Sequence, residues 1–204
     1  NSLCVSTSCK VDYGNSPGMA AFAKQVAKLC EENYPKIKQI LPDGKLQPPY
    51  QIIFKQKQAN PGETQGSVIS LSSEWFTVHP DDFGAIVHEM AHVVQGYPAG
   101  PPFWLVEGIG DYVRYKLGYQ NSWSYPHCGA GSESYNSGYW CSTAFLMFVE
   151  KNYDQDIIAK LNADLRGNRY QDSLFQLYAG KSIESLWQEC QQTDCKIKKE
   201  LSSF

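Results

Sequence analysis

The chain has 204 residues, of which 42% are hydrophobic and 19% are charged, a balance typical of globular rather than disordered proteins. Its formal net charge is −3 and it has no long basic run, which argues against general polyanion binding, so we expect no nucleic-acid partner. The longest apolar stretches, such as residues 144–149, are far shorter than the roughly 20 residues that span a bilayer, so we expect no membrane partner.

This length suits one large domain or two lobes around one core. We predict a single domain over residues 1–204, with an N-terminal α/β lobe over about 1–96 and a helical lobe over about 97–204. Seven cysteines indicate an oxidising compartment, so we expect a secreted, extracellular protein. Because the sequence carries no signal peptide, Asn1 is expected to be a mature N-terminus left by processing.

The cysteines predict disulfides rather than a second zinc site, because no C-x-x-C spacing occurs. The preferred pairing joins Cys128 to Cys141, which flank a loop rich in Gly and Ser. Cys30, on an apolar helix face, is then the free thiol. The four cysteines near the termini are expected to pair among themselves: Cys4, Cys9, Cys190 and Cys195.

The first half of the chain predicts helices followed by strands. Ser16-Pro17 is typical of a helix start, and apolar residues follow at helical spacing as far as residue 30. Pro35 is expected to interrupt this helix, leaving a short helix over 37–41. Residues 50–54 read as a buried strand, and 60–62 as a turn. A second strand over 67–72 has polar flanks that suit a sheet edge.

A motif helix is predicted to open at His79-Pro80, with Phe83, Val87, Met90 and Val94 on its core face. The helices expected after it share helical spacing of apolar residues and cover about 103–117, 139–151, 156–165, 173–178 and 183–190. The predicted fold class is therefore α+β.

His88-Glu89-Met90-Ala91-His92 is the most informative motif in the chain. On a helix, residues i and i+4 lie one turn apart on the same face, so His88 and His92 can both reach one Zn²⁺. Glu89 lies beside such a metal, where a general base for a metal-bound water is needed. We therefore predict one Zn²⁺ per chain and a hydrolytic role for Glu89.

A catalytic zinc ion takes three protein ligands and leaves one position for water. The third ligand is expected from Glu107 or Asp111, and His127 or His79 are weaker candidates. We assign Glu107 to the metal and Asp111 to accept the second ring N–H of a ligand histidine, which orients that ring. The reverse assignment, with Asp111 on the metal, stays open.

Two glycines lie between these acids, although glycine costs up to about 1 kcal/mol relative to alanine inside a helix. We interpret Gly108 and Gly110 as positions where the missing side chains let this helix approach the motif helix closely.

Residues 102–108, PFWLVEG, resemble the W-L-x-E-G element that supplies the third ligand in gluzincin metallopeptidases. More narrowly, residues 88–95 followed by 107–114 resemble the basic secretory protein family, secreted proteins of plants, fungi and bacteria regarded as zinc metallopeptidases. The likeness covers about residues 66–190 and includes Gly138-Tyr139, 144–146 and Leu186-Trp187. The acidic charge balance and the many cysteines depart from the family's pattern. These departures concern the basic surface that the family's name implies and do not concern the metal site.

The resemblance implies a zincin-like fold, with a small mixed sheet and an edge strand in the N-terminal lobe, a central motif helix and a mostly helical C-terminal lobe. It also implies a secreted endopeptidase, expected to be a monomer, that acts on peptide or protein substrates. Tyr139 is our candidate for the donor that stabilises the oxyanion, with Tyr112 and Tyr135 as rivals.

Substrate contacts are predicted in two places. The strand over 67–72 is a candidate for pairing with extended peptide. Trp123, Tyr125 and Tyr135 lie in loop-like sequence and are candidates for a cleft wall. Two alternative functions stay open: a binding or defence protein with the same fold and little turnover, and zinc-dependent hydrolysis of a non-peptide amide or ester.

Overall fold

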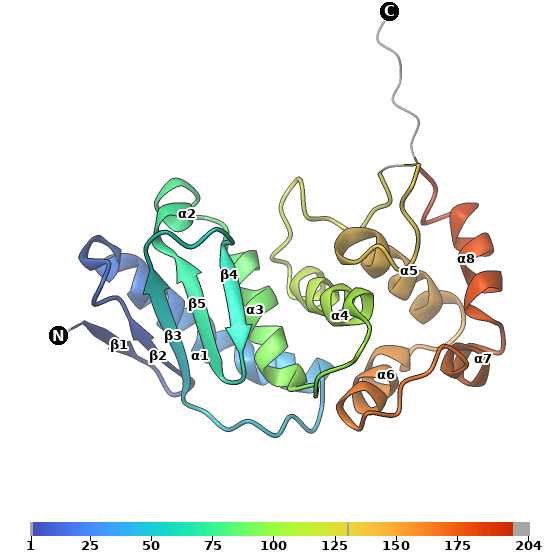
Figure 1. The fold of residues 1–204 in the computed structure, drawn as a ribbon, viewed down its shortest axis with the longest axis horizontal. Coiled ribbons are helices and arrows are strands. Elements are labelled where there is room, and N and C mark those ends of the chain that lie inside the picture. Colours follow the sequence, from blue (N-terminus) through green and yellow to red (C-terminus); the bar gives the residue numbers. More distant parts are fainter. Residues whose placement is uncertain (1, 130, 198–204) are drawn as a thin grey trace, which may run out of the picture. The chain divides into compact units, whose positions relative to one another are not determined.

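The computed structural model describes residues 2–129 and 131–197. These residues form a five-stranded mixed sheet and eight α-helices, an α+β architecture as predicted (Figure 1). The chain divides into two compact units, the first made of residues 1–96 and 116–121, and the second of 97–115 and 122–204. Within the described residues, no helix combines the length and apolar character needed to cross a membrane.

The sheet belongs to the first unit and has the strand order β1-β2-β3-β5-β4. The three central strands, β2, β3 and β5, are parallel, and an antiparallel strand flanks them on each side. The strand bounds are β1 Leu3–Val5, β2 Cys9–Asp12, β3 Tyr50–Lys55, β4 Gly62–Gln65 and β5 Val68–Ser72.

The edge-strand prediction for residues 67–72 is wrong, because β5 pairs with β3 on one side and β4 on the other. Both serines of β5 are buried. Ser72 Oγ accepts a hydrogen bond of 3.1 Å from the backbone N–H of Trp75 and so caps the following helix. The edge on this side of the sheet is instead β4, which begins at Gly62, within the predicted turn. Strands β1 and β2 were not predicted either, because segments of three and four residues are too short to show a strand pattern.

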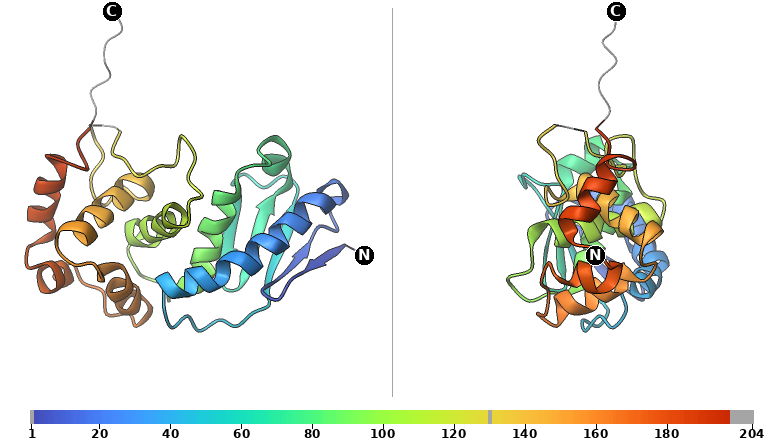
Figure 2. Two further views of the ribbon diagram at one scale, coloured as in Figure 1. Left: turned by 180° about the vertical axis from the view of Figure 1, so that it is seen from behind. Right: turned by 90° about the vertical axis from the view of Figure 1, so that its right-hand side faces the viewer.

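Helices α1 (Ala20–Ile40) and α3 (Phe83–Gln95) cover one face of this sheet, and the short α2 (Ser73–Val78) follows β5 (Figures 1 and 2). Pro17 opens a 3₁₀ turn directly before α1, as the sequence indicated. The predicted interruption at Pro35 does not occur, since α1 continues through it. Tyr34 and Ile37 on either side are fully buried, and this packing outweighs the backbone hydrogen bond that proline removes.

The motif helix α3 begins at Phe83, later than predicted, because α2 and a short turn occupy residues 73–82. Its predicted core face is buried at Val87, Met90 and Val94. The helix ends at Gly96, whose φ of 51° is the left-handed conformation that glycine adopts without a steric penalty.

The second unit contains the remaining helices, each within two residues of its predicted bounds. Its interior holds a cluster of aromatic rings in which Phe145 contacts Trp104, Phe175 and Trp187 at centroid distances of 6.2, 5.8 and 6.0 Å. The helices are α4 Phe103–Lys116, α5 Tyr139–Asn152, α6 Ile157–Arg166, α7 Leu174–Ala179 and α8 Ile183–Gln191.

Six of the seven cysteines form disulfides, and the predicted pairing is only partly correct. Cys128–Cys141 is present, and Cys190 pairs with Cys195. Cys9 pairs with Cys30, so Cys30 is not the free thiol. Both are fully buried because Cys9 faces inward from β2 and Cys30 faces it from α1. The free cysteine is Cys4, on β1.

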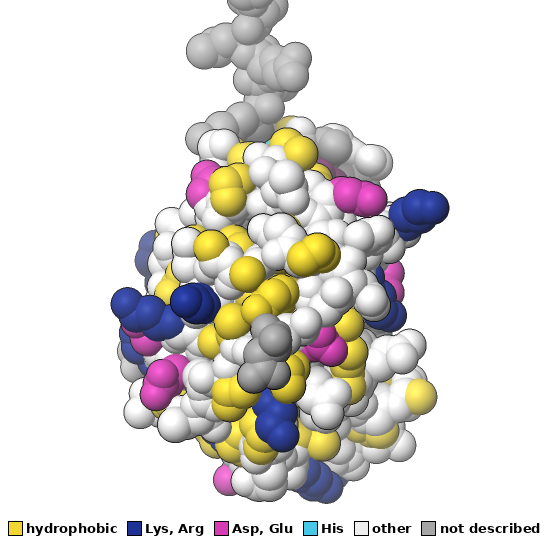
Figure 3. All heavy atoms as spheres, turned by 90° about the vertical axis from the view of Figure 1, so that its left-hand side faces the viewer, with side chains coloured by type: hydrophobic (Ala, Val, Ile, Leu, Met, Phe, Trp, Pro, Cys, Tyr) yellow, Lys and Arg dark blue, Asp and Glu magenta, His cyan; other side chains and the backbone are white. Residues whose placement is uncertain are grey.

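The strand β1 lies at the outer edge of the sheet and exposes 51% of Leu3 and 64% of Val5. Hydrophobic side chains gather along the middle of the face seen in Figure 3, and basic and acidic side chains lie mostly around them, singly or in small mixed groups. This face therefore carries no continuous basic surface.

Candidate metal centre

His88 and His92 lie one turn apart on α3, as the motif spacing predicts. Their Nε2 atoms are 3.0 Å apart, and their ring centroids are separated by 4.6 Å with the ring planes at 89°. His88 is 7% exposed and His92 is partly buried. Both rings thus direct the same nitrogen to one point beside the helix.

Gln95 orients the ring of His92, and the sequence analysis missed it. The Gln95 side chain is 2% exposed, and its Oε1 lies 2.8 Å from His92 Nδ1. Because an amide oxygen only accepts hydrogen bonds, this contact places the proton of a neutral imidazole on Nδ1 and leaves the lone pair on Nε2. Its position three residues after His92, on the same helix face, was the signal available in the sequence.

Glu89 completes the cluster. A carboxylate oxygen of Glu89 and the ring nitrogens of His88 and His92 all lie within 4.8 Å of one another. Glu89 is only 9% exposed, and its Oε1 accepts a hydrogen bond of 2.9 Å from the hydroxyl of Thr64 on β4. A buried carboxylate is therefore held beside the two imidazoles.

This donor set fits a zinc ion. Two imidazole nitrogens 3.0 Å apart need a proton or a cation between them, and the Gln95 contact leaves a lone pair on His92 Nε2. Nitrogen ligands 2.0–2.1 Å from one tetrahedral Zn²⁺ are about 3.3 Å apart, a few tenths of an ångström from the observed separation. A small rotation of either ring is enough to accommodate the ion.

The two acids predicted for the third ligand lie on α4, in the second unit. Glu107 is partly buried and Asp111 is buried, one turn further along the helix. Their spacing puts both carboxylates on the same face of α4. Glu107 as the metal ligand and Asp111 as the partner of a ligand histidine stay predictions.

Gly108 lies where α4 packs against α5. A methyl group built on its Cα would lie 3.0 Å from Ser142 Cβ and 3.4 Å from Leu146 Cδ1, both on α5. The hydroxyl of Thr143 also donates a 2.8 Å hydrogen bond to the Gly108 carbonyl. The atoms nearest to this methyl position belong to α5. The expectation that the missing side chain of Gly108 lets α4 approach the motif helix is therefore wrong, because it makes room for α5.

Tyr139, the candidate oxyanion donor, begins α5 with a φ of 49°, a conformation that a bulky residue rarely adopts. The hydroxyl of Thr143 donates a 2.9 Å hydrogen bond to the Tyr139 carbonyl, and the Gly138 N–H donates a 2.8 Å bond to Ser142 Oγ. These contacts hold the strained backbone. Strained residues cluster at functional sites, and the role of Tyr139 as oxyanion donor stays a prediction.

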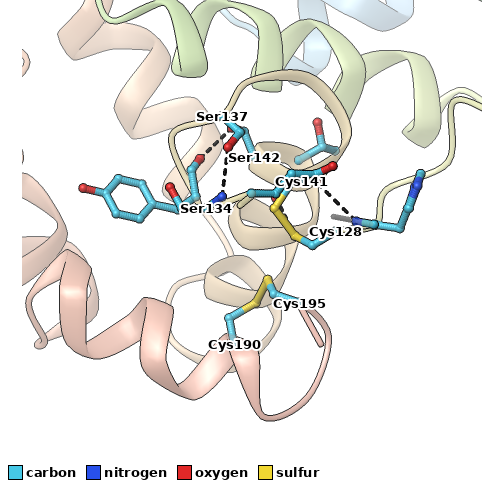
Figure 4. The surroundings of a disulfide bond; sticks show 12 residues. Cys128, Ser134, Ser137, Cys141, Ser142, Cys190 and Cys195 are labelled. Atoms are coloured by element: carbon cyan, nitrogen blue, oxygen red, sulfur yellow. Dashed lines mark hydrogen bonds between the residues drawn. A yellow bond between two sulfur atoms is a disulfide. The ribbon is translucent and has the colours of Figure 1, made fainter. Parts of the chain in front are cut away.

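The loop before Tyr139 is tied to α5 at several points (Figure 4). The Cys128–Cys141 disulfide joins its start to the helix. Ser142 Oγ donates a 2.6 Å hydrogen bond to the Tyr135 carbonyl, and the Ser134 N–H donates a 2.8 Å bond to Ser137 Oγ. The disulfide therefore helps to set where α5, and with it Tyr139, begins.

The rival tyrosines have packing roles. The Tyr112 hydroxyl donates a hydrogen bond to Glu150 Oε2, and burial, followed by this bond, raises the pKa of Tyr112 far above its usual value. The Tyr135 ring contacts Trp104 at 5.3 Å and Trp187 at 6.2 Å, and burial raises its pKa as well. Both hydroxyls are thus held in their protonated form.

Of the other aromatic candidates, Trp123 and Tyr125 are exposed on the second unit, and their place in a cleft wall stays a prediction. The ring of His127 stacks on Tyr125 at 4.2 Å, and its Nδ1 lies 2.7 Å from the Tyr125 carbonyl. His79, at the end of α2, packs its ring against Trp75 at 4.1 Å. The two remaining histidines therefore have local packing partners.

A family model described as a peptidase of plants and bacteria matches residues 60–190, more than half of the chain. The match includes β4, the whole motif helix and both acids of α4. Comparison with curated proteins and with solved structures gave no match.

Proposed function

Because the chain belongs to this peptidase family of plants and bacteria, we propose that it is a secreted zinc-dependent endopeptidase of the gluzincin type. The observation that carries the proposal is the cluster on α3, where two imidazole Nε2 atoms lie 3.0 Å apart beside the buried carboxylate of Glu89. In this proposal His88, His92 and Glu107 hold the metal, and peptides or proteins are the substrates.

A bound zinc ion supplies Lewis acidity and lowers the pKa of a coordinated water to about 7. Glu89 is proposed to take a proton from the attacking water and later to give a proton to the leaving amine. A site that used zinc only for structure would need no carboxylate that stays uncoordinated beside the metal. Glu89 therefore favours an enzyme.

The remaining residues position these groups. Gln95 holds the His92 ring through Nδ1, and Asp111 is proposed to do the same for a ligand histidine. Tyr139 is proposed to donate a hydrogen bond to the oxyanion that forms on the attacked carbonyl. Its strained backbone, held by Thr143, supports this role.

Extended peptide is proposed to pair with β4, since this strand, and not β5, lies at the edge of the sheet. Backbone hydrogen bonds along a strand edge can bind a peptide largely independently of its side chains. The exposed rings of Trp123 and Tyr125 are proposed as contacts for substrate side chains.

Secretion is supported by the three disulfides, which form and persist in oxidising compartments. A monomeric protein with one Zn²⁺ per chain is part of the same proposal.

The test combines metal analysis with proteolysis of casein. Purified protein grown with zinc is expected to contain about one Zn²⁺ per chain and to lose activity with a chelator. Glu89→Gln should keep the zinc and lose on the order of 10²–10⁴-fold in turnover, the usual contribution of a general base. Glu74→Gln, an exposed residue of α2, is the matched control and should be fully active.

The outcomes separate the alternatives. Zinc without turnover on any peptide or on casein would favour the binding or defence protein. Turnover of a simple amide or ester alone would favour the non-peptide hydrolase. Full activity of Glu89→Gln would reject the mechanism.

A further inference from the structure

The Glu89 side chain contacts β4, an edge strand of the sheet. Two residues of β4, Gly62 and Thr64, stand opposite Leu71 and Ile69 of β5 and so share the sheet face that α1 and α3 cover. The other strands fill this face with buried apolar side chains: Val11, Ile52, Phe54, Ile69 and Leu71. At the edge of the sheet (Figure 1), β4 instead carries a glycine and a threonine on this face.

The Thr64 hydroxyl has two acceptors on one residue. It lies 2.9 Å from Glu89 Oε1 and 3.2 Å from the Glu89 carbonyl oxygen. A hydroxyl has one proton to donate, and bonds to a charged acceptor are about twice as strong as bonds to a neutral one. The shorter contact, to the carboxylate, is therefore the dominant one.

Gly62 makes room for the same side chain. A methyl group built on Gly62 Cα would lie 2.7 Å from Glu89 Cγ and 3.3 Å from Cδ, closer than packed carbon atoms approach. Any larger residue at this position would push the Glu89 side chain from its place. Two alternate residues of one strand thus fix Glu89, one by contact along its stem and the other by a hydrogen bond to its carboxylate.

We infer that Thr64 is a positioning residue for the general base, and that Gly62 provides the space this arrangement needs. The inference rests on the proposed role of Glu89. The hydrogen bond occupies Oε1 and restricts rotation of the carboxylate, so the second oxygen is presented to the attacking water in one orientation. The same strand is proposed to pair with the peptide, which would couple the placement of the base to that of the scissile bond.

The test compares kcat, KM and zinc content. Thr64→Val keeps the shape of the side chain without the donor and is expected to lower kcat about tenfold, with KM and zinc content unchanged. Thr64→Ser restores the hydroxyl and should recover kcat to within a few-fold of the wild type. Gly62→Ala should lower kcat at least as far as Thr64→Val.

Thr77→Val is the matched control. Thr77 also donates its own hydrogen bond, 2.7 Å to the Ser73 carbonyl on α2, but that bond does not involve Glu89. Its loss is expected to leave kcat unchanged. A fall in kcat of Thr77→Val equal to that of Thr64→Val would overturn the inference, because removal of any such hydroxyl would then suffice.

A second readout needs neither metal nor activity. In the metal-free protein, Thr64→Val should raise the unfolding equilibrium constant about tenfold, as loss of a charged hydrogen bond does. The same substitution in a Glu89→Ala background removes only the bond to the backbone carbonyl and should have a much smaller effect. Equal effects in the two backgrounds would show that the carboxylate is not the partner of Thr64.

The inference and the proposed function fail differently. If Glu89→Gln is inactive while Thr64→Val keeps wild-type kcat, or loses it only together with zinc, the positioning role is overturned and the general base stands. If Glu89→Gln is fully active, the proposed function itself fails, and the coupling in the metal-free protein reports a purely structural contact.

Discussion

His92 Nε2 lies 3.0 Å from His88 Nε2, while the opposite nitrogen of the same His92 ring is held by Gln95 at 2.8 Å. One nitrogen of the ring is thus used for orientation and the other is left for a ligand bond.

Removal of either motif histidine should abolish zinc binding. His88→Ala or His92→Ala leaves one imidazole in the cluster, and zinc should then no longer raise Tm, whereas the wild type gains about 4 kcal/mol at a metal concentration 1,000 times Kd. Zinc content and thermal unfolding with and without metal measure this. His79→Ala and His127→Ala are the controls and should keep the metal; zinc loss in either would bring that histidine into the ligand set.

Gln95→Leu should weaken zinc binding by about 10- to 100-fold, because the His92 ring loses the partner that fixes its proton on Nδ1. Gln95→Glu keeps an acceptor and should bind zinc much more tightly than Gln95→Leu. Competition with a chelator of known affinity, at one fixed pH, gives both values. Equal affinity for the leucine variant and the wild type would remove Gln95 from the site.

The third ligand can be assigned by comparing two isosteric variants. Glu107→Gln should lower zinc affinity more than Asp111→Asn, because the first removes a charged ligand and the second weakens only a contact to a ligand ring. The measurement is again chelator competition. A larger loss for Asp111→Asn would favour the reverse assignment.

Cys4 should be the one cysteine that a thiol reagent modifies in the folded protein, since the other six are paired. Cys4→Ser should abolish this reaction with little change in Tm. Loss of the Cys128–Cys141 bond, by serine at both positions, should cost about 3 kcal/mol of unfolding free energy, as expected for a loop of this length. Labelling at Cys30 would contradict the pairing with Cys9.

Stability should fall above pH 10. Burial, followed by the hydrogen bond to Glu150, raises the pKa of Tyr112 above its usual value of 10.0. The unfolded chain therefore loses this proton first, and stability that is fully present below pH 10 is lost as the pH rises, by up to about 1.4 kcal/mol per pH unit for each such tyrosine. Urea unfolding between pH 8 and 11 measures the slope, and Tyr112→Phe should make it shallower. An unchanged slope in this variant would show that Tyr112 ionises alike in both states.

Local patterns in the sequence were sufficient to predict the helices of the second unit and the helical spacing of the H-E-x-x-H motif. Helical periodicity and the i, i+4 spacing of His88 and His92 depend only on backbone geometry, which any helix shares. The family resemblance rests on the same local runs of residues, and the family match covers nearly the same range.

Contacts between distant segments required the tertiary structure. The pairing of Cys9 with Cys30 and the edge position of β4 depend on which strands become neighbours, and short strands such as β1, β2 and β4 carry almost no periodic signal. The contact of Thr64 with Glu89 joins residues 25 positions apart, and neither residue by itself indicates the other. A hydroxyl acquires its role from the acceptor that folding brings within 3 Å of it, and that distance is a property of packing rather than of spacing along the chain.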